Sequence, residues 1–211
     1  MPDLRPNPTL CLEYRADQPI HYAFLEQAGR CPGATAILAR HTTCNYAQLA
    51  QISQGIAACL LEQSASGADR VVIVASRGAG LVYAMLGCLR AGLAFTVADA
   101  AYPPARIGQI IRTLTPAVVL RCGEASVDTD GPLVITVPET TAEALQAFPC
   151  HCVALPSVSP EQPAYITFTS GSTGEPKGIV THHAPLVHFI DWHVRQHGFT
   201  QADTFSLLSG L

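Results

Sequence analysis

Short β-branched runs alternate with longer segments of helical apolar spacing along most of this sequence. The run RVVIVAS (70–76) has the composition of a strand buried on both faces of a sheet. It is followed by GAGLVYAMLGCLRAG (78–92), a helical pattern whose last glycine marks the end of the helix. Because alternating strands and helices build parallel sheets with crossover helices, we expect an α/β fold with a mostly parallel sheet and helices on both faces.

The same patterns divide the rest of the chain. We expect helices over 21–31, 46–64, 78–92, 103–116, 140–148 and 183–199, and strands over 35–40, 42–46, 70–76, 93–99, 117–122, 130–138 and 163–170. Residues 1–20 are rich in proline and polar residues and are expected to form an N-terminal arm. The run DTFSLLSGL (203–211) is expected to begin one more strand. Because the chain stops inside that run, we expect residues 21–211 to be the front part of a larger catalytic domain.

Composition narrows the classes of function. Hydrophobic residues make up 48% of the chain and charged residues only 13%, which is apolar for a soluble domain that stands alone. We therefore expect the chain to contact further protein, for example as a dimer through exposed apolar surface. The net charge is -4 and no Lys/Arg cluster occurs, which argues against nucleic-acid binding. No secretory signal and no apolar run of about 20 residues is present, so we expect a cytoplasmic protein without a membrane span.

Eight cysteines raise the possibilities of a disulfide scaffold or a metal site. They are scattered, and the one dense cluster, Cys150-His151-Cys152, has no second ligand pair at a sensible spacing. We therefore interpret them as reduced thiols and predict no metal ligands in this chain.

The segment FTSGSTGEPKG (168–178) combines hydroxyls, glycines and one lysine, between an expected strand and an expected helix. Ligands of open α/β sheets lie outside the carboxyl ends of the strands, where such a loop emerges. Lys177 supplies a point charge suited to phosphate oxygens, and glycines let backbone amides approach an anion. The spacing does not match the P-loop pattern GxxxxGK[ST]. A flexible Gly/Ser linker is the alternative, but we predict a polyphosphate-binding loop. The predicted binding residues are Thr169, Ser170, Gly171, Ser172, Thr173, Gly174, Lys177 and Gly178.

This loop resembles the signature of the ANL adenylate-forming enzymes, which comprise acyl-CoA synthetases, luciferases and nonribosomal peptide synthetase adenylation domains. Their pattern [ST]-S-G-[ST]-T-G-x-P-K-G is matched without a gap over 169–178. Two upstream segments, CNYAQLA (44–50) and LRAGLAFTVADAAYPPAR (89–106), resemble earlier family motifs in the right order. The sequence is most similar to the L-2-aminoadipate reductase type and its bacterial synthetase relatives. Val97, Ala98 and Ala100 depart from the family pattern at positions that bear on packing.

The resemblance implies one half-reaction, in which a carboxylic or amino acid attacks the α-phosphate of MgATP to give an acyl-adenylate and pyrophosphate. The acyl group then passes to the phosphopantetheine thiol of a carrier protein. Lys177 is the implied catalytic residue, beside the amides of 172–174. The family's acyl pocket, its adenine and ribose contacts, its Mg²⁺-binding glutamate and its C-terminal lysine all follow the segment matched here. The resemblance therefore implies that this chain needs the rest of the adenylation domain and is inactive alone. The carboxylate that is activated cannot be read from this segment.

Several other residues have two interpretations each. Arg106 is either a functional residue or, as we prefer, a surface helix residue, and Tyr102 is expected to pack in the same turn. His182 and His183 either help to position the loop or belong to the start of a helix. His193 and His197 have the i,i+4 spacing of metal ligands, but without a third ligand we expect solvated helix-face side chains. We expect Trp192 to lie in the core or in a pocket wall.

Three hypotheses follow. The chain is the N-terminal piece of an adenylating enzyme, a non-catalytic fragment that serves as a nucleotide-binding or protein-interaction module, or an unrelated nucleotide-binding protein. The two upstream motifs argue against the third.

Overall fold

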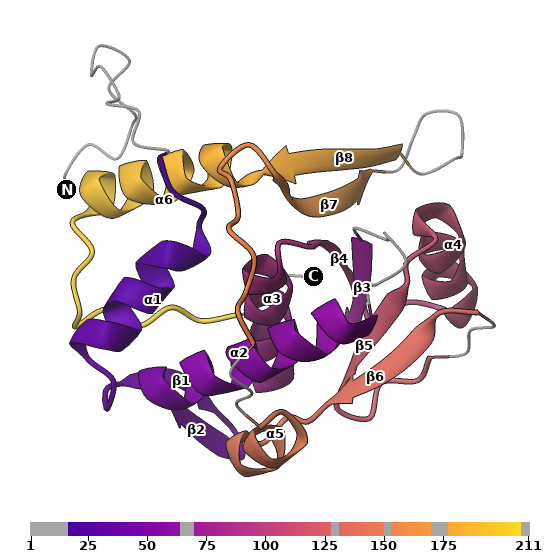
Figure 1. The fold of residues 1–211 in the computed structure, drawn as a ribbon, viewed down its shortest axis with the longest axis horizontal. Coiled ribbons are helices and arrows are strands. Elements are labelled where there is room, and N and C mark those ends of the chain that lie inside the picture. Colours follow the sequence, from indigo (N-terminus) through magenta and orange to yellow (C-terminus); the bar gives the residue numbers. More distant parts are fainter. Residues whose placement is uncertain (1–16, 64–69, 128–130, 150–152, 170–176, 208–211) are drawn as a thin grey trace.

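The centre of the molecule is a six-stranded sheet in the order β6-β5-β3-β4-β7-β8 (Figure 1). The computed structural model describes residues 17–63, 70–127, 131–149, 153–169 and 177–207. The strands of this sheet are β3 (Arg70–Ala75), β4 (Ala94–Asp99), β5 (Val118–Cys122), β6 (Leu133–Val137), β7 (Pro163–Thr169) and β8 (Lys177–His182). Neighbouring strands are parallel from β6 to β7, and β8 runs antiparallel to β7. The expected mostly parallel sheet is confirmed.

Six helices and a small hairpin surround the sheet in the described part of the chain. The helices are α1 (His21–Arg30), α2 (Tyr46–Gln63), α3 (Ala79–Ala91), α4 (Pro104–Leu114), α5 (Thr141–Ala147) and α6 (His183–His197). The hairpin pairs β1 (Thr35–Ala39) with β2 (Thr42–Asn45). Within the described residues, no helix is long and apolar enough to cross a membrane.

Alternate residues of β3 supply the two faces of the sheet. Val71 and Ile73 belong to the larger apolar cluster, which includes side chains of α2 and α3. Val72 and Val74 belong to a second cluster, which includes Ile107 and other residues of α4. Helices therefore cover both faces of the sheet, as the sequence predicts.

The helix ends follow local chemistry. Gly92 adopts the left-handed conformation (φ 71°) immediately after α3, and its N–H donates to the carbonyl of Leu89 (3.3 Å). This is the stop signal expected from the sequence. At the start of α5, the Thr140 hydroxyl accepts from the Glu143 N–H, as in one half of a capping box, and it donates to the Glu143 carboxylate.

One sequence expectation about the connections is wrong. The loop after β7 leads into strand β8, and α6 begins only at His183, so the loop does not directly precede a helix. β7 is half-buried, because its outer neighbour β8 is an exposed edge strand.

The expected strand over 203–211 does not begin in its described part. Residues 203–207 have no regular secondary structure, and Phe205 is 68% exposed. No described strand pairs with them. The remaining residues of this run lie outside the described residues, as do residues 1–16 of the expected arm, which stays a prediction.

Candidate phosphate-binding site

The two ends of the 169–178 segment lie opposite each other at the end of the β7–β8 hairpin. Thr169 pairs with Lys177 in the antiparallel register, and the Thr169 hydroxyl donates to the Lys177 carbonyl (3.5 Å). The structure therefore brings together Thr169, Lys177 and Gly178 of the predicted site. The other predicted residues, Ser170, Gly171, Ser172, Thr173 and Gly174, lie outside the described residues, and their roles stay predictions.

The hairpin places this segment at the carboxyl edge of the sheet. β7 is parallel to β4, which is parallel to β3, so Thr169 ends its strand at the same edge as Asp99 and Ala75. Ligands of open α/β sheets bind outside this edge. The two described ends of the segment thus lie at the edge where the sequence predicts the loop, although a strand follows it.

Lys177 is exposed at the first position of β8, and it forms no ion pair within the described residues. Gly178, beside it, lies against Ile166 of β7, where an added Cβ would come within 3.2 Å of the Ile166 side chain. The register thus keeps Lys177 at the loop end of the hairpin, while Gly178 packs on β7. An unpaired ammonium group in this position is suited to bind an anion.

A second glycine-containing turn, Gly78-Ala79-Gly80, lies at the same edge and is occupied by the side chain of Glu139. The Glu139 carboxylate, from the connection between β6 and α5, accepts a hydrogen bond from the N–H of Gly80 at the start of α3 (3.1 Å). A Cβ on Gly78 or Gly80 would collide with that carboxylate. Because helix N-termini favour negative charge, the Glu139 carboxylate is stabilised at this position and satisfies a free N–H of α3.

Sequence reasoning missed Glu139. The signal available was the Gly-Ala-Gly turn between a buried strand and a helix, which is typical of an anion site. The sequence carries no signal that a carboxylate 59 residues further along would fill it.

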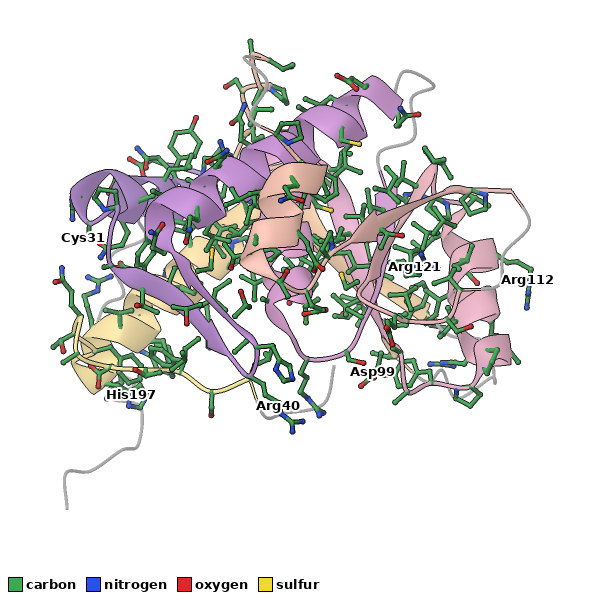
Figure 2. The ribbon with its side chains drawn as sticks, turned by 90° about the horizontal axis from the view of Figure 1, so that it is seen from below. Cys31, Arg40, Asp99, Arg112, Arg121 and His197 are labelled. Carbon is green, nitrogen blue, oxygen red and sulfur yellow. The ribbon has the colours of Figure 1, made fainter. Side chains whose placement is uncertain are left out.

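The turn after β4 is held by its own backbone and by Asp99, which Figure 2 labels. The Asp99 carboxylate accepts from the N–H of Ala101 (2.9 Å), and its carbonyl accepts from the N–H of Tyr102 (2.9 Å). Arg106 lies in the first turn of α4 and is half-buried. This is the helix position that we expected for it.

His182 and His183 differ in environment. His182 is the N-cap residue of α6, but its side chain makes no capping hydrogen bond. His183 is buried as the first residue of α6, and its Nδ1 accepts a hydrogen bond from the N–H of Ile20 (3.4 Å). The structure thus joins the exit of the hairpin to the start of α1.

His193 and His197 lie toward the other end of α6, and Figure 2 shows His197 there. Their rings meet edge to face with centroids 4.6 Å apart, beside Phe199. Nowhere in the described ranges do three or more His, Cys, Asp or Glu side chains form a group that could hold a metal ion.

The described cysteines are free thiols. Cys88 and Cys122 are buried in the core, and burial raises the pKa of both thiols well above the ordinary range. These two side chains therefore behave as small hydrophobic groups.

Comparisons with known proteins agree with the sequence resemblance. Residues 24–210 match the family model of the AMP-binding enzymes. The chain is 36% identical over 183 residues to the nonribosomal peptide synthetase anaPS of Neosartorya fischeri, covering 85% of this chain and 8% of that protein. It is 28% identical over 244 residues to the L-2-aminoadipate reductase of Schizosaccharomyces pombe, covering 98% of this chain and 17% of the reductase.

A solved structure shows the same architecture. The nonribosomal peptide synthetase FmoA3, in its AMPPNP-bound form, superimposes with a TM-score of 0.81 at 29% identity, covering 92% of this chain and 20% of that one. The chain thus spans less than a quarter of the length of each of these relatives.

Proposed function

Since this chain belongs to the AMP-binding enzyme family, we propose that it supplies the phosphate-binding loop of an adenylate-forming ligase. In the proposed half-reaction, a carboxylate oxygen of the substrate bonds to the α-phosphorus of ATP. The bond from that phosphorus to the bridging oxygen breaks, and pyrophosphate leaves with the bonding electrons. The single observation that carries the proposal is the exposed Lys177 opposite Thr169, at the carboxyl edge of the sheet.

The proposed role of the loop is charge stabilisation. Negative charge grows on pyrophosphate as it leaves, and donors held in place before the reaction stabilise that charge without having to reorganise. We assign this role to the Lys177 ammonium group and the backbone amides of residues 172–174, together with the hydroxyls of Thr169, Ser170, Ser172 and Thr173. Glycines on either side would let the segment close over the triphosphate and reopen.

The described ends of the loop offer donors and a positive charge, which fits a polyphosphate. Mg²⁺ would neutralise phosphate charge in the same reaction, and we expect its ligands mostly outside this chain.

The substrate and the partners are proposed by relationship. The similar proteins are named as peptide synthetases and as an L-2-aminoadipate reductase, which supports an amino acid or another carboxylic acid as the substrate. We propose that the acyl group passes to a carrier-protein phosphopantetheine thiol. We also propose that residues 21–211 act together with the rest of an adenylation domain in the cytoplasm, behind an arm over 1–20.

An alternative function as an interaction module has an observation of its own. Ile179 of β8 and Phe189 of α6 are 51% and 55% exposed, and Val180, Ile190 and Val194 are exposed on the same two elements. Apolar surface of this kind is suited to contact another part of the protein or a second copy of it. Light scattering of the chain tests for a second copy, and a monomer at high micromolar concentration would contradict dimerisation.

Pyrophosphate exchange tests the proposed function. The complete protein that contains this chain should exchange labelled pyrophosphate into ATP in the presence of its carboxylic acid. No exchange with a broad panel of amino and carboxylic acids would contradict the proposal. The chain of 211 residues alone should show weak or undetectable ATP binding by calorimetry, whereas sub-micromolar binding would show that it needs no further part of the domain.

A further inference from the structure

The β7–β8 hairpin has few connections to the rest of the sheet. A single Cα pair, Phe95 with Tyr165, defines the register between β4 and β7. The buried Thr96 hydroxyl adds a hydrogen bond to the carbonyl of Ile166. On its other side the hairpin ends in β8, the edge strand. Its orientation must therefore depend also on contacts at its base, where β7 begins and β8 ends.

The base of the hairpin is joined to two neighbouring segments. The N–H groups of His183 and Ala184 donate to the carbonyls of Gln162 (3.2 Å) and Pro160 (2.9 Å), which precede β7. The side chain of His183, only 1% exposed, accepts from the N–H of Ile20 just before α1. In Figure 1, α1 begins beside α6.

His21, the first residue of α1, completes this contact. Its side chain is 5% exposed, and its ring meets the ring of His183 nearly edge-on, with centroids 5.9 Å apart. The ring of Tyr22 also lies close to that of His21, with centroids 5.1 Å apart. Among the described residues, no group hydrogen-bonds to Nδ1 of His21.

Arg90 of α3 holds a fixed positive charge close to this pair. Its guanidinium donates to the carbonyl of Ala50 (2.6 Å) and to the hydroxyl of Ser53 (2.7 Å), and it also bonds to the amide oxygen of Gln54. It is buried and interacts electrostatically with His21. The imidazoles of α1 and α6 therefore contact each other, and the Arg90 guanidinium of α3 adds a positive charge that acts on His21.

We propose that His21 and His183 are positioning residues, whose buried ring pair fixes the base of the β7–β8 hairpin against α1 and so sets the position of Thr169 and Lys177 at the other end of the hairpin. We call this pair the histidine clamp. The effect of the clamp on nucleotide binding rests on the proposed function, but the clamp itself is a property of the fold.

The clamp works only with uncharged imidazoles. Burial, the neighbouring His183 and Arg90 together lower the pKa of His21 to about 4. Burial and the adjacent His182 lower the pKa of His183. In the described part of the chain, the charged or titratable groups found beside the pair are Arg90, His182 and Tyr22. Protonation would place a new positive charge beside Arg90 in a buried site, so acid should open the clamp.

Hydrogen exchange of the full chain, measured by mass spectrometry without nucleotide, tests the clamp. In His183→Ala, peptides covering 177–187 should exchange at least about tenfold faster, because the base of the hairpin opens locally. Peptides covering β3 should keep their rates. His183→Asn should restore only part of the protection, because its side-chain oxygen can accept from Ile20 as Nδ1 does but it has no ring to meet His21. His41→Ala, in the exposed turn between β1 and β2, is the matched control and should change neither region.

A second experiment uses the wild-type chain and needs no variant. After correction for the intrinsic pH dependence of exchange, acidification from pH 7 to pH 4.5 should release the hairpin peptides before those of β3. Unchanged hairpin rates in His183→Ala, or an equal rise in β3, would overturn the proposal. So would hairpin and β3 peptides that open together on acidification, and this second experiment decides the matter if the variant does not fold. Because no nucleotide is present, the result is independent of the pyrophosphate-exchange test.

Discussion

Lys177 is the residue whose chemistry the proposed function uses most directly. It stands exposed where the loop rejoins the sheet, and its register partner, Thr169, fixes that position. A single ammonium group at this point has phosphate oxygens as its natural partner, whereas the substrate carboxylate lies on the other side of the α-phosphorus. We therefore expect it to act in the chemical step more than in carboxylate binding.

Lys177→Ala in the complete protein should slow adenylate formation by about 10²-fold, since one donor to the developing charge is removed. The apparent affinity for the carboxylate should change little. Pyrophosphate exchange at varied carboxylate concentration measures both quantities. Arg195→Ala, which removes an exposed charge on α6, is the control and should retain the wild-type rate. An unchanged rate in Lys177→Ala would remove this residue from the mechanism.

Glu139 has a structural role at the same edge of the sheet. Its carboxylate accepts from the first turn of α3, and Glu139→Ala should lower the free energy of unfolding by about 1 kcal/mol. Urea denaturation measures the change. Glu26→Ala is the matched control, because Glu26 forms only an exposed pair with Arg30 and should change stability by less than about 0.5 kcal/mol. Equal effects of the two substitutions would contradict the assigned capping role.

At the scale of elements, the sequence predicts the sheet better than the hairpin. β3 is a continuous β-branched run with both faces buried, so its period and composition are unambiguous. β8 is an edge strand whose residues KGIVTH directly follow a glycine-containing loop. In the sequence these residues therefore look like the end of the loop and not like a separate strand. The expected strand over 203–211 has the composition of a strand but no partner in the described residues, and pairing partners cannot be read from a local pattern.

The candidate site divides in the same way. The loop could be found from the sequence, because its hydroxyls, glycines and lysine are consecutive. The histidine clamp and the Glu139 cap could not, because each joins residues that are 59 or more positions apart. Only the fold brings such residues together.

Close packing of α2 against the segment after α5 gives a prediction for an element. A Cβ on Gly55 of α2 would collide with the backbone of Phe148, which cannot move aside as a flexible side chain could. Gly55→Ala should therefore destabilise the chain by about 1–3 kcal/mol, although alanine favours helices. Gly29→Ala on α1, where nothing lies within 4 Å, is the matched control and should be neutral or stabilising. Thermal and urea unfolding compare the two, and a stable Gly55→Ala would show that this contact is not tight.

At the scale of the whole molecule, the two faces of the sheet are unequally covered. The larger apolar cluster lies under α2 and α3, while α4 supplies the helical side of the smaller one. Exposed apolar residues gather on β8 and α6, the elements that carry and follow the loop. The part of the molecule proposed to bind nucleotide is thus also a part with several exposed apolar side chains.

The stability of the whole chain should fall in acid, partly because of His21. Its pKa is lowered to about 4 in the folded protein, so between pH 6.5 and 4 the unfolded chain binds a proton that the folded chain does not. From pH 7 to pH 4 this group alone should remove roughly 3 kcal/mol of stability. Urea unfolding across this range measures the loss. His21→Phe should lose less stability on acidification than wild type, whereas an identical pH dependence would show that His21 does not titrate as assigned.

A crystal structure of the complete protein with a non-hydrolysable ATP analogue tests the central claim most directly. The account predicts that the β- and γ-phosphates lie within hydrogen-bonding distance of the Lys177 ammonium group and of backbone amides in 172–174, at the carboxyl edge of β7. A triphosphate bound elsewhere, with residues 169–178 directed away from it, would contradict the account.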